Sequence, residues 1–245
     1  VKAKPKAETK VTANKVKANR KAKKRVVSSR TSEHNVYTHF PRDPHCDICR
    51  EYKAQRARCS SKTVHAQDRL PIPTKFGMIV ADHKIINEED ENRHCDRVAL
   101  VMQDRFTSWL QSYASQTKDA NECKRAFQRY LGVIQTPIEI HIYSDNAPEL
   151  NLACKELGLS HDTCTPHRSE TNGIAENAVK RVNQGTMCTL GQSGWSEKWW
   201  REAMKCYCFL RNVVDILVGG HTAYFMRFGV DYSGPTFPYG CHVRY

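Results

Sequence analysis

The chain lacks any run of 18 or more apolar residues, the length that a membrane-spanning helix requires. Its first 30 residues contain no apolar segment of the kind found in secretory signal peptides. The 11 cysteines lie singly in apolar surroundings, apart from two close pairs, which is not the spacing of a small secreted disulfide scaffold. We therefore expect a soluble protein that is not exported, keeps its thiols reduced and has no membrane partner.

Acidic and aromatic residues are nearly absent from the N-terminal segment. Residues 1–30 hold twelve Lys or Arg and one acid, Glu8, so they account for +11 of the net charge of +12. Such a segment cannot bury enough apolar surface to offset its ordering entropy, and we expect residues 1–33 to be a disordered basic arm. Lys-Ala-Lys-Lys-Arg at 21–25 would serve nuclear import or phosphate binding, and the alternative is a solvated linker from a longer polyprotein.

Two histidines precede a Cys-x-x-Cys pair in the next segment, residues 34–60. Imidazoles and thiolates suit a closed tetrahedral zinc site, and a two-residue gap lets one tight turn present both sulfurs to the same ion. Because the segment is short of hydrophobic residues, the metal would supply the missing stability. The predicted Zn²⁺ ligands are His34, His39, Cys46 and Cys49, with His45 or Cys59 as alternatives to His34. The plainer alternative is a proline-rich loop with unligated cysteines.

Strand-like and helix-like patterns alternate through residues 70–216. Three apolar or alternating runs come first, and a tight turn at 104–105 joins the last two. The expected elements are strands at 76–85, 97–103 and 106–113, a helix at 119–131, a strand at 138–143, a helix at 149–157, a strand near 160–164, a loop at 165–172 and a long helix from Ile174. This order predicts an α/β domain with a ribonuclease H-like five-stranded mixed sheet flanked by helices.

Three carboxylates lie at positions in this element order where they could meet. Asp82 lies inside the first strand, Asp145 directly follows the fourth, and Glu176 falls in the first turn of the long helix. If the first and fourth strands are neighbours, the three side chains meet, and crowded carboxylates repel one another unless a cation neutralises them. We predict two Mg²⁺ or Mn²⁺ ions here, which would activate an attacking hydroxyl and stabilise a leaving oxygen.

Each carboxylate also has a plainer explanation. Asp145 would serve as a turn residue that ends a strand, and Asp82 as a charge on an edge strand. Glu176 would be favoured by the helix dipole, with Asn172 or Gly173 as the cap. Only the joint occurrence of the three in this element order favours a catalytic site.

Residues 75–216 resemble the catalytic core of retroviral and retrotransposon integrases. The resemblance is carried by Tyr-Ser-Asp-Asn at 143–146 and by Thr-Pro-His-Arg-Ser-Glu-Thr-Asn-Gly-Ile-Ala-Glu-Asn-Ala-Val-Lys-Arg at 165–181. The His/Cys segment takes the place of the family's zinc domain. Within the C-terminal extension, residues 217–245, the stretch 222–245 looks like the tail that follows copia-type cores, with Tyr-Phe-Met-Arg-Phe-Gly at 224–229 and Tyr-Gly-Cys at 239–241. The resemblance implies a DDE-type integrase, a strand transferase with endonuclease activity that processes the 3′ ends of element DNA and joins them to target DNA.

The resemblance also implies roles for single residues. Asp82, Asp145 and Glu176 would form the catalytic triad, and Thr171, Asn172 and Gly173 would belong to a mobile loop at the DNA end. Lys180 would touch a phosphate, which also makes physical sense because positions four apart share a helix face. The implied partners are element and target DNA and further copies of the chain in a dimer or tetramer. The implied location is the nucleus, after a cytoplasmic or virus-like-particle stage.

The chain departs from the family's pattern in two spacings. Only 30 residues separate Asp145 from Glu176, and only six separate His39 from Cys46, both fewer than the family uses. A zinc knuckle in place of the helical zinc domain, or a degenerate module, would explain the second. Two alternative functions therefore stay open: a catalytically inactive or domesticated integrase-like DNA-binding protein, and a ribonuclease H-like hydrolytic nuclease.

An apolar stripe follows the long helix. Its members recur at helical spacing; they are Trp195, Trp199, Trp200, Ala203, Cys206, Phe209 and Leu210. The stripe is either core or a dimer surface, and we favour partial burial combined with dimerisation. His83, His141 and His167 are near enough to the expected site to approach it, but isolated histidines beside strands are more often structural, and we assign them no role.

Overall fold

The computed structural model describes residues 33–54, 73–86, 90–132, 139–163, 169–217, 219–242 and 244. These residues all belong to the unit Ser32–Tyr245. Residues 1–32 of the predicted basic arm lie outside the described residues, as do Cys59 and His167. Among the helices that are described, none is long and apolar enough to cross a membrane.

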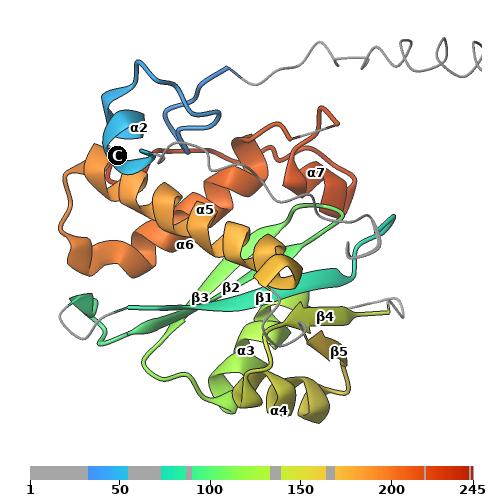
Figure 1. Ribbon diagram of the computed structural model, residues 1–245. Helices are drawn as coiled ribbons and strands as arrows, with labels where there is room; N and C mark the ends of the chain where they lie inside the picture. The colour runs from blue at the N-terminus through green and yellow to red at the C-terminus, as the bar shows by residue number, and fades with distance from the viewer. Residues whose placement is uncertain are drawn as a thin grey trace, which may run out of the picture. The chain divides into compact units, whose positions relative to one another are not determined.

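Five strands form one mixed sheet in the order β3-β2-β1-β4-β5 (Figure 1). β1 (Met78–Ile85), β2 (Val98–Asp104) and β3 (Leu110–Ser115) pair in antiparallel fashion. β4 (His141–Ser144) runs parallel to β1, and β5 (Ser160–Thr163) runs parallel to β4. The predicted ribonuclease H-like sheet is confirmed, including the pairing of the first and fourth strands.

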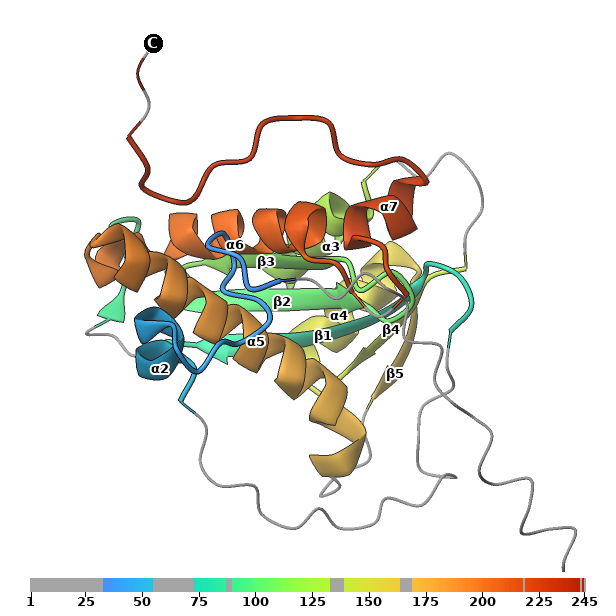
Figure 2. The same cartoon turned by 90° about the horizontal axis from the view of Figure 1, so that it is seen from above.

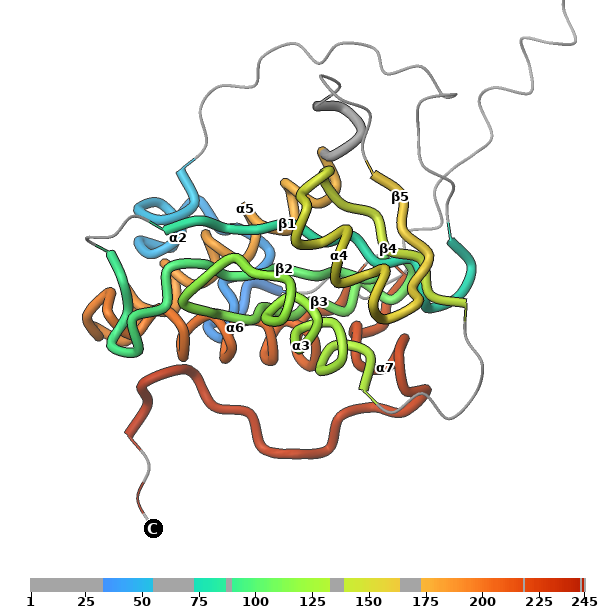
Figure 3. The backbone as a smooth tube through the Cα atoms, turned by 90° about the horizontal axis from the view of Figure 1, so that it is seen from below, coloured from blue at the N-terminus to red at the C-terminus, as the bar shows by residue number. Residues whose placement is uncertain are grey.

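Helices cover both faces of the sheet, and a separate core fills each side (Figures 1 and 2). On one face α3 (Ala120–Leu131) and α4 (Pro148–Leu157) pack on Ile79, Ala81 and Leu100. On the other face α5 (Ser169–Ser193) and α6 (Trp200–Val214) pack on Ala99, Val101 and Leu110. Because successive strand residues point to opposite faces, the alternating residues of β1 and β2 divide between the two cores. Figure 3 shows α3 and α4 from their own side.

Helix α5 begins at Ser169, five residues before the predicted start at Ile174. The predicted loop is therefore wrong for residues 169–172, and Glu176 lies two turns inside the helix instead of in its first turn. Asn172 and Gly173 had indicated a helix cap, but inside a helix each costs only about 1 kcal/mol or less relative to alanine. Neighbouring packing outweighs that cost, since Ala175, Ala178 and Val182 are all buried.

The turn between β2 and β3 is longer than predicted. The buried Asp104 carboxylate accepts hydrogen bonds from the backbone N–H of Phe106 and Thr107 at 3.1 and 2.7 Å, and another from Gly77 at 3.0 Å. These bonds hold residues 105–109 in a loop, so the third strand starts at Leu110 and not at Phe106.

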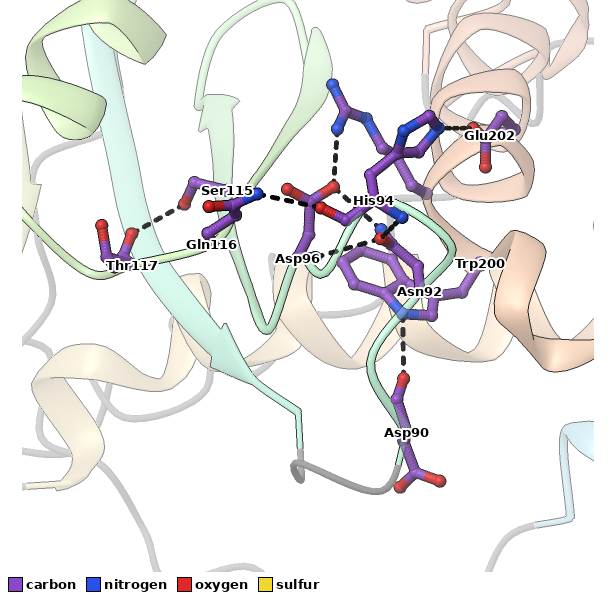
Figure 4. Close-up of polar contacts among 10 residues, drawn as sticks. Asp90, Asn92, His94, Asp96, Ser115, Gln116, Thr117, Trp200 and Glu202 are labelled. Carbon is purple, nitrogen blue, oxygen red and sulfur yellow. Dashed lines mark hydrogen bonds and ion pairs between the residues drawn. The ribbon is translucent and has the colours of Figure 1, made fainter.

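A polar network ties the chain between β1 and β2 to helix α6 (Figure 4). The Asp96 carboxylate is buried and accepts from Asn92 Nδ2 at 2.9 Å and from Arg201 Nη1 at 2.6 Å. Nearby, Trp200 donates to the backbone oxygen of Asp90 at 3.2 Å. The network fixes α6 against one end of the antiparallel strands.

The C-terminal extension contains α7 (Ala223–Phe228) and then runs alongside α6 (Figures 2 and 3). Tyr239 of this segment packs near Trp195, with ring centroids 6.2 Å apart, and Tyr232 packs edge-on to Phe209 at 5.4 Å. Trp195 and Phe209 stay 44% and 39% exposed, whereas Trp200 is buried. Partial burial of the predicted stripe is confirmed. Its description as a single helical stripe is wrong, because Trp195 follows the end of α5 and Trp199 belongs to a short 3-10 helix, Glu197–Trp199.

Candidate active site and metal-binding segment

The pairing of β1 with β4 brings Asp82 and Asp145 together. Val80 is paired with Tyr143 and Ala81 with Ser144, so the next position on each strand carries an aspartate. Parallel strands keep their residues in register, and the two aspartates therefore lie next to each other at the carboxyl end of β4, in the middle of the sheet. This register brings the two aspartates to adjacent strands, and the charge of Asp145 acts on Asp82. Their catalytic role stays a prediction.

Helix α5 adds Glu176 to the same place. Ala175 is buried against Val80 and Tyr143 in a small apolar cluster. Asp82 lies two residues after Val80 and so shares its face of the sheet. Since Ala175 sits on that face, the next residue, Glu176, lies within electrostatic reach of Asp82, and its own side chain remains exposed. The charge of Glu176 acts on Asp82 accordingly.

The carboxylates repel one another in the absence of a cation. Burial raises the pKa of Asp82 to about 6, and the charges of Asp145 and Glu176 raise it as well, while the backbone N–H of His83 and the ammonium of Lys118 lower it. Asp145 Oδ1 is buried and has no hydrogen-bond partner among the described residues. An unpaired buried oxygen beside two further carboxylates is a donor set of hard oxygens, which fits Mg²⁺ or Mn²⁺.

Lys118 and Glu149 also belong to the site, although the sequence offered no periodic signal for them. Lys118 precedes α3, Glu149 lies in the first turn of α4, and their side chains pair at 2.8 Å between Nζ and Oε1. Burial lowers the pKa of Lys118, but the bond to Glu149 and the charges of Asp145 and Asp82 outweigh it and raise the pKa. The Lys118 ammonium therefore lies within electrostatic reach of the aspartates.

The histidines of strands β1, β4 and β5, which are His83, His141 and His161, have other partners. His83 points to the opposite face, where Cys123 Sγ lies 3.6 Å from its Nε2 and burial lowers its pKa to about 4. His141 pairs with Asp162 at 3.2 Å. His161, which had not been singled out, lies 2.8 Å from Ser144 Oγ, directly before Asp145.

Thr171, Asn172 and Gly173 form part of the first turns of α5, so the prediction that they belong to a mobile loop is wrong as to structure. Lys180 lies one turn beyond Glu176 on the same helix, as predicted, and is exposed. Contact of these residues with DNA stays a prediction.

The predicted zinc ligands come together in the described structure. One ligand atom from each of His34, His39, Cys46 and Cys49 lies within 4.8 Å of all the others. Cys46 Sγ is 3.4 Å from His39 Nδ1, close to the distance of about 3.5 Å that two ligands of one tetrahedral zinc ion would have. The fourth member is His34 and not His45, while Cys59 lies outside the described residues.

The imidazoles of this cluster are oriented by further bonds. His39 Nε2 lies 2.9 Å from Gln192 Oε1 of α5, which leaves Nδ1 toward the sulfurs. His34 Nδ1 lies 2.7 Å from the backbone oxygen of Pro41, which leaves Nε2 available. Outer partners of this kind select the tautomer and the ring orientation of metal-binding histidines.

The predicted metal-binding segment, residues 34–54 and called the metal segment from here on, is docked on the core by helix α2 (Asp47–Tyr52). A Cβ atom at Gly191 of α5 would lie 2.2 Å from the Tyr52 ring, so only glycine permits this close approach. Asn35 Nδ2 donates to Asp215 Oδ1 at 3.1 Å, and Thr38 bonds to the same carboxylate. The segment and the core thus share buried polar contacts as well as helix packing.

Comparisons with known proteins find similarity at the level of structure. No family model and no curated protein matches the chain. The chain is 16% identical to the catalytic core domain of BIV integrase, covering 62% of this chain and 93% of that one at a TM-score of 0.46. It is 15% identical to the HTLV-2 integrase catalytic core domain solved in complex with magnesium, covering 62% and 97% at a TM-score of 0.48.

A third similar structure is a chain of the simian T-cell lymphotropic virus intasome, 17% identical at a TM-score of 0.46. The alignment covers 72% of this chain and 63% of that one, so it spans less than two thirds of the viral chain. At such identities these likenesses concern the fold alone. The sheet order and the flanking helices of this chain have the ribonuclease H-like arrangement.

Proposed function

We propose that this chain is a DDE-type integrase: a polynucleotidyl transferase that trims the 3′ ends of an element's DNA and joins the new 3′ hydroxyls to target DNA. The observation that carries the proposal is the carboxylate cluster, in which Asp145 Oδ1 is buried without a partner and burial together with two neighbouring charges raises the pKa of Asp82. Carboxylates whose pKa is shifted by burial and by neighbouring charges are typical of functional sites.

Asp82, Asp145 and Glu176 would hold two Mg²⁺ or Mn²⁺ ions. When bound, such ions activate the attacking water or hydroxyl and stabilise the charge on the leaving 3′ oxygen. The chain's own contribution is positioning. The β1–β4 register and the packing of Ala175 support neighbouring positions for the three carboxylates, and Lys118 would offset part of their negative charge.

Lys180 is suited to hold the DNA backbone next to the carboxylates. It is exposed one turn after Glu176, on a helix face that continues from the cluster. A cation there would pair with a phosphate and fix the register of the strand without reading its bases. Thr171, Asn172 and Gly173, nearer the start of the helix, would contact the DNA end.

His34, His39, Cys46 and Cys49 would bind a structural Zn²⁺. Two sulfurs and two ring nitrogens form a complete tetrahedral set, which leaves no open position for substrate. Binding would deprotonate the thiols and stabilise a segment that has little apolar core of its own. A copia-type retrotransposon origin, action as a dimer or tetramer and a nuclear location form the rest of this proposal.

The test is nicking of supercoiled plasmid by the purified chain in Mg²⁺ or Mn²⁺, which requires no knowledge of the element's ends. Asp145→Asn and Glu176→Gln should each reduce nicking by at least about 10²-fold, because each removes a metal ligand. Asp162→Asn is the matched control, since Asp162 is an exposed carboxylate on the neighbouring strand β5. Nicking that survives in both triad variants would contradict the proposal.

A second arm separates transfer from hydrolysis. A labelled oligonucleotide with a free 3′ hydroxyl is added to the same reaction, and covalent joining of the label to plasmid is scored. Joining supports strand transfer. Nicking without joining would favour a hydrolytic nuclease, and DNA binding without either activity would favour a catalytically inactive integrase-like protein.

A further inference from the structure

A basic groove lies between the metal segment and the helices α5 and α6. It has a volume of about 360 Å³ and is lined by residues from all three parts of the molecule. Its cations are Arg42, Lys53, Lys180, Arg181 and Arg211, and no carboxylate lines it. The groove is separate from the carboxylate cluster but shares helix α5 with it.

The positive charge of the groove is only partly offset by the protein, because the buried carboxylate of Asp215 acts on Arg181, Arg211 and Lys53. Within the described part of the chain, none of the five cations forms a salt bridge. Arg211 is buried and donates to the backbone oxygen of Ser108 at 3.0 Å, and Arg181 donates to Gln103 Oε1 at 2.9 Å. Burial lowers the pKa of Arg181, and the neighbouring charge of Arg211 lowers it further. Five cations beside one neighbouring carboxylate leave a net positive charge, which favours an anion from outside.

The two cations at the rim are the ones most available to a ligand. Arg42 of the metal segment and Lys180 of α5 are exposed, and among the described residues neither has a hydrogen-bond partner. Lys53 instead donates to the backbone oxygens of Thr38 and His39 at 3.1 and 2.9 Å, which fixes the wall of the groove. The groove thus has a rigid base and a free cation on each side.

The groove leads away from the carboxylates along α5. With a rise of about 1.5 Å per residue, Lys180 lies about 6 Å and Gln184 about 12 Å beyond Glu176 along the helix axis. Successive phosphates of one strand of a DNA duplex advance by about 3.4 Å each. A strand whose scissile bond lay at Glu176 would therefore present several phosphates to the groove.

We propose that this groove binds the phosphate backbone of the DNA strand that enters the carboxylate site, and that the metal segment of the same chain supplies one of its walls through Arg42. The inference rests on the proposed function for the identity of the strand. It assigns the metal segment a direct part in holding DNA in addition to its own folding.

The test compares two charge reversals in the full-length chain. Arg42→Glu changes the groove, whereas Arg50→Glu makes the same change of net charge on the same segment, at an exposed residue that pairs with Asp47 outside the groove. Binding of a fluorescent duplex is measured by anisotropy over a range of salt concentrations. We expect Arg42→Glu to weaken binding about 10-fold and to reduce the salt dependence by at least one ion, and Arg50→Glu to change affinity less than about 2-fold.

Equal affinities of the two variants would overturn the proposal. If either reversal fails to fold, Arg42→Gln and Arg50→Gln replace the pair, with about 3-fold and no loss expected. The alternative is that the groove binds a small free anion, such as inorganic phosphate, instead of the DNA backbone. Calorimetric binding of inorganic phosphate that Arg42→Glu abolishes, with unchanged DNA affinity, would also overturn the proposal.

The outcome is independent of the catalytic test. If the wild-type chain fails to nick plasmid and yet Arg42→Glu loses affinity, the integrase proposal fails and the groove stands. If the wild-type chain nicks plasmid normally and Arg42→Glu binds DNA as well as Arg50→Glu does, the groove proposal fails and the integrase proposal is supported.

Discussion

The His/Cys cluster and the carboxylate cluster are assembled in opposite ways. The four His/Cys ligands come from one stretch of 16 residues, His34 to Cys49, and most of their bonds are local. The carboxylates come from β1, from the end of β4 and from α5, and they meet only through the register of the sheet and the packing of Ala175. A metal in the first cluster would hold its own segment together, whereas a metal in the second would occupy a site that the folded core already provides.

The largest effect should come from removing a ligand of the His/Cys cluster. Cys49→Ser should lose zinc and release residues 34–54, because structural zinc contributes several kcal/mol or more to folding. Hydrogen exchange of this segment and the zinc content of the purified protein measure the effect. Cys95→Ser is the control, since Cys95 is an exposed cysteine outside the cluster. Unchanged protection of residues 34–54 would mean that the segment folds without metal.

Alanine substitutions at three glycines of α5 test the docking of the metal segment and the packing of the core independently. Gly185→Ala should cost about 2–3 kcal/mol, because its Cβ would lie 2.1 Å from the buried Tyr207 ring of α6. Gly191→Ala should instead leave the core intact and speed exchange in residues 34–54 about 10-fold, because Tyr52 is displaced.

Gly173→Ala is the matched control for both changes, since nothing lies within 4 Å of its Cβ position. It should be neutral or stabilise the helix by about 1 kcal/mol. Thermal unfolding reports on the core and hydrogen exchange on the segment. If Gly191→Ala lowered the melting temperature as much as Gly185→Ala, the segment and the core would unfold as one unit.

The carboxylate cluster should make the free energy of unfolding depend on pH. Asp82 has a pKa of about 6 in the folded chain against 3.8 ordinarily, so the folded state binds the proton more tightly. Its ionisation therefore costs stability, and the fold gains stability as the pH falls from about 6 to about 4. Without added magnesium, Asp82→Asn should be about 1–2 kcal/mol more stable than wild type at pH 7 and equal to it near pH 4.

Magnesium should reverse this difference at pH 7. It would stabilise the wild-type chain, because a cation relieves the repulsion among the carboxylates, and it should leave Asp82→Asn nearly unchanged. Thermal unfolding with and without magnesium checks both statements. A wild-type melting temperature that does not respond to magnesium would contradict the assignment of these carboxylates as a metal site.

The smallest effect is expected at Lys118. Lys118→Met should raise the apparent pKa of Asp82 further, since the ammonium lowers it, and should cost less than about 1 kcal/mol because the pair with Glu149 is partly exposed. Lys124→Met is the control. It breaks a similar pair between α3 and α4, with Glu156 at 2.6 Å, but it does not act on Asp82. Equal pH profiles for the two variants would show that Lys118 has no special link to the carboxylates.

The sequence predicted best what depends on local spacing or on element order. The His/Cys ligands follow from a two-residue gap and nearby histidines, and the meeting of Asp82 with Asp145 follows from which strands are neighbours. The start of α5 was missed because Asn172 and Gly173 are typical helix caps, and only burial of the following residues shows that the helix continues through them.

Features that join distant parts of the chain were not predictable in this way. Lys118 and Glu149 lie 31 positions apart, one before α3 and the other in the first turn of α4, and no periodicity links them. The groove draws its cations from the metal segment, α5 and α6, each of which looks like an ordinary charged surface by itself. The cover that Tyr239 provides over Trp195 likewise depends on the path of the C-terminal segment beside α6.

Helix α5 carries Glu176 near one end and Gln192, the partner of His39, near the other. Sixteen residues of helix set the two sites about 24 Å apart along the axis, roughly the length of seven base pairs of duplex. A single inserted residue between them would turn Gln192 by about 100° around the axis, and His39 would lose its partner. The number of helical residues between Glu176 and Gln192 is therefore constrained, whereas insertions in the loops of the chain would leave both sites in place.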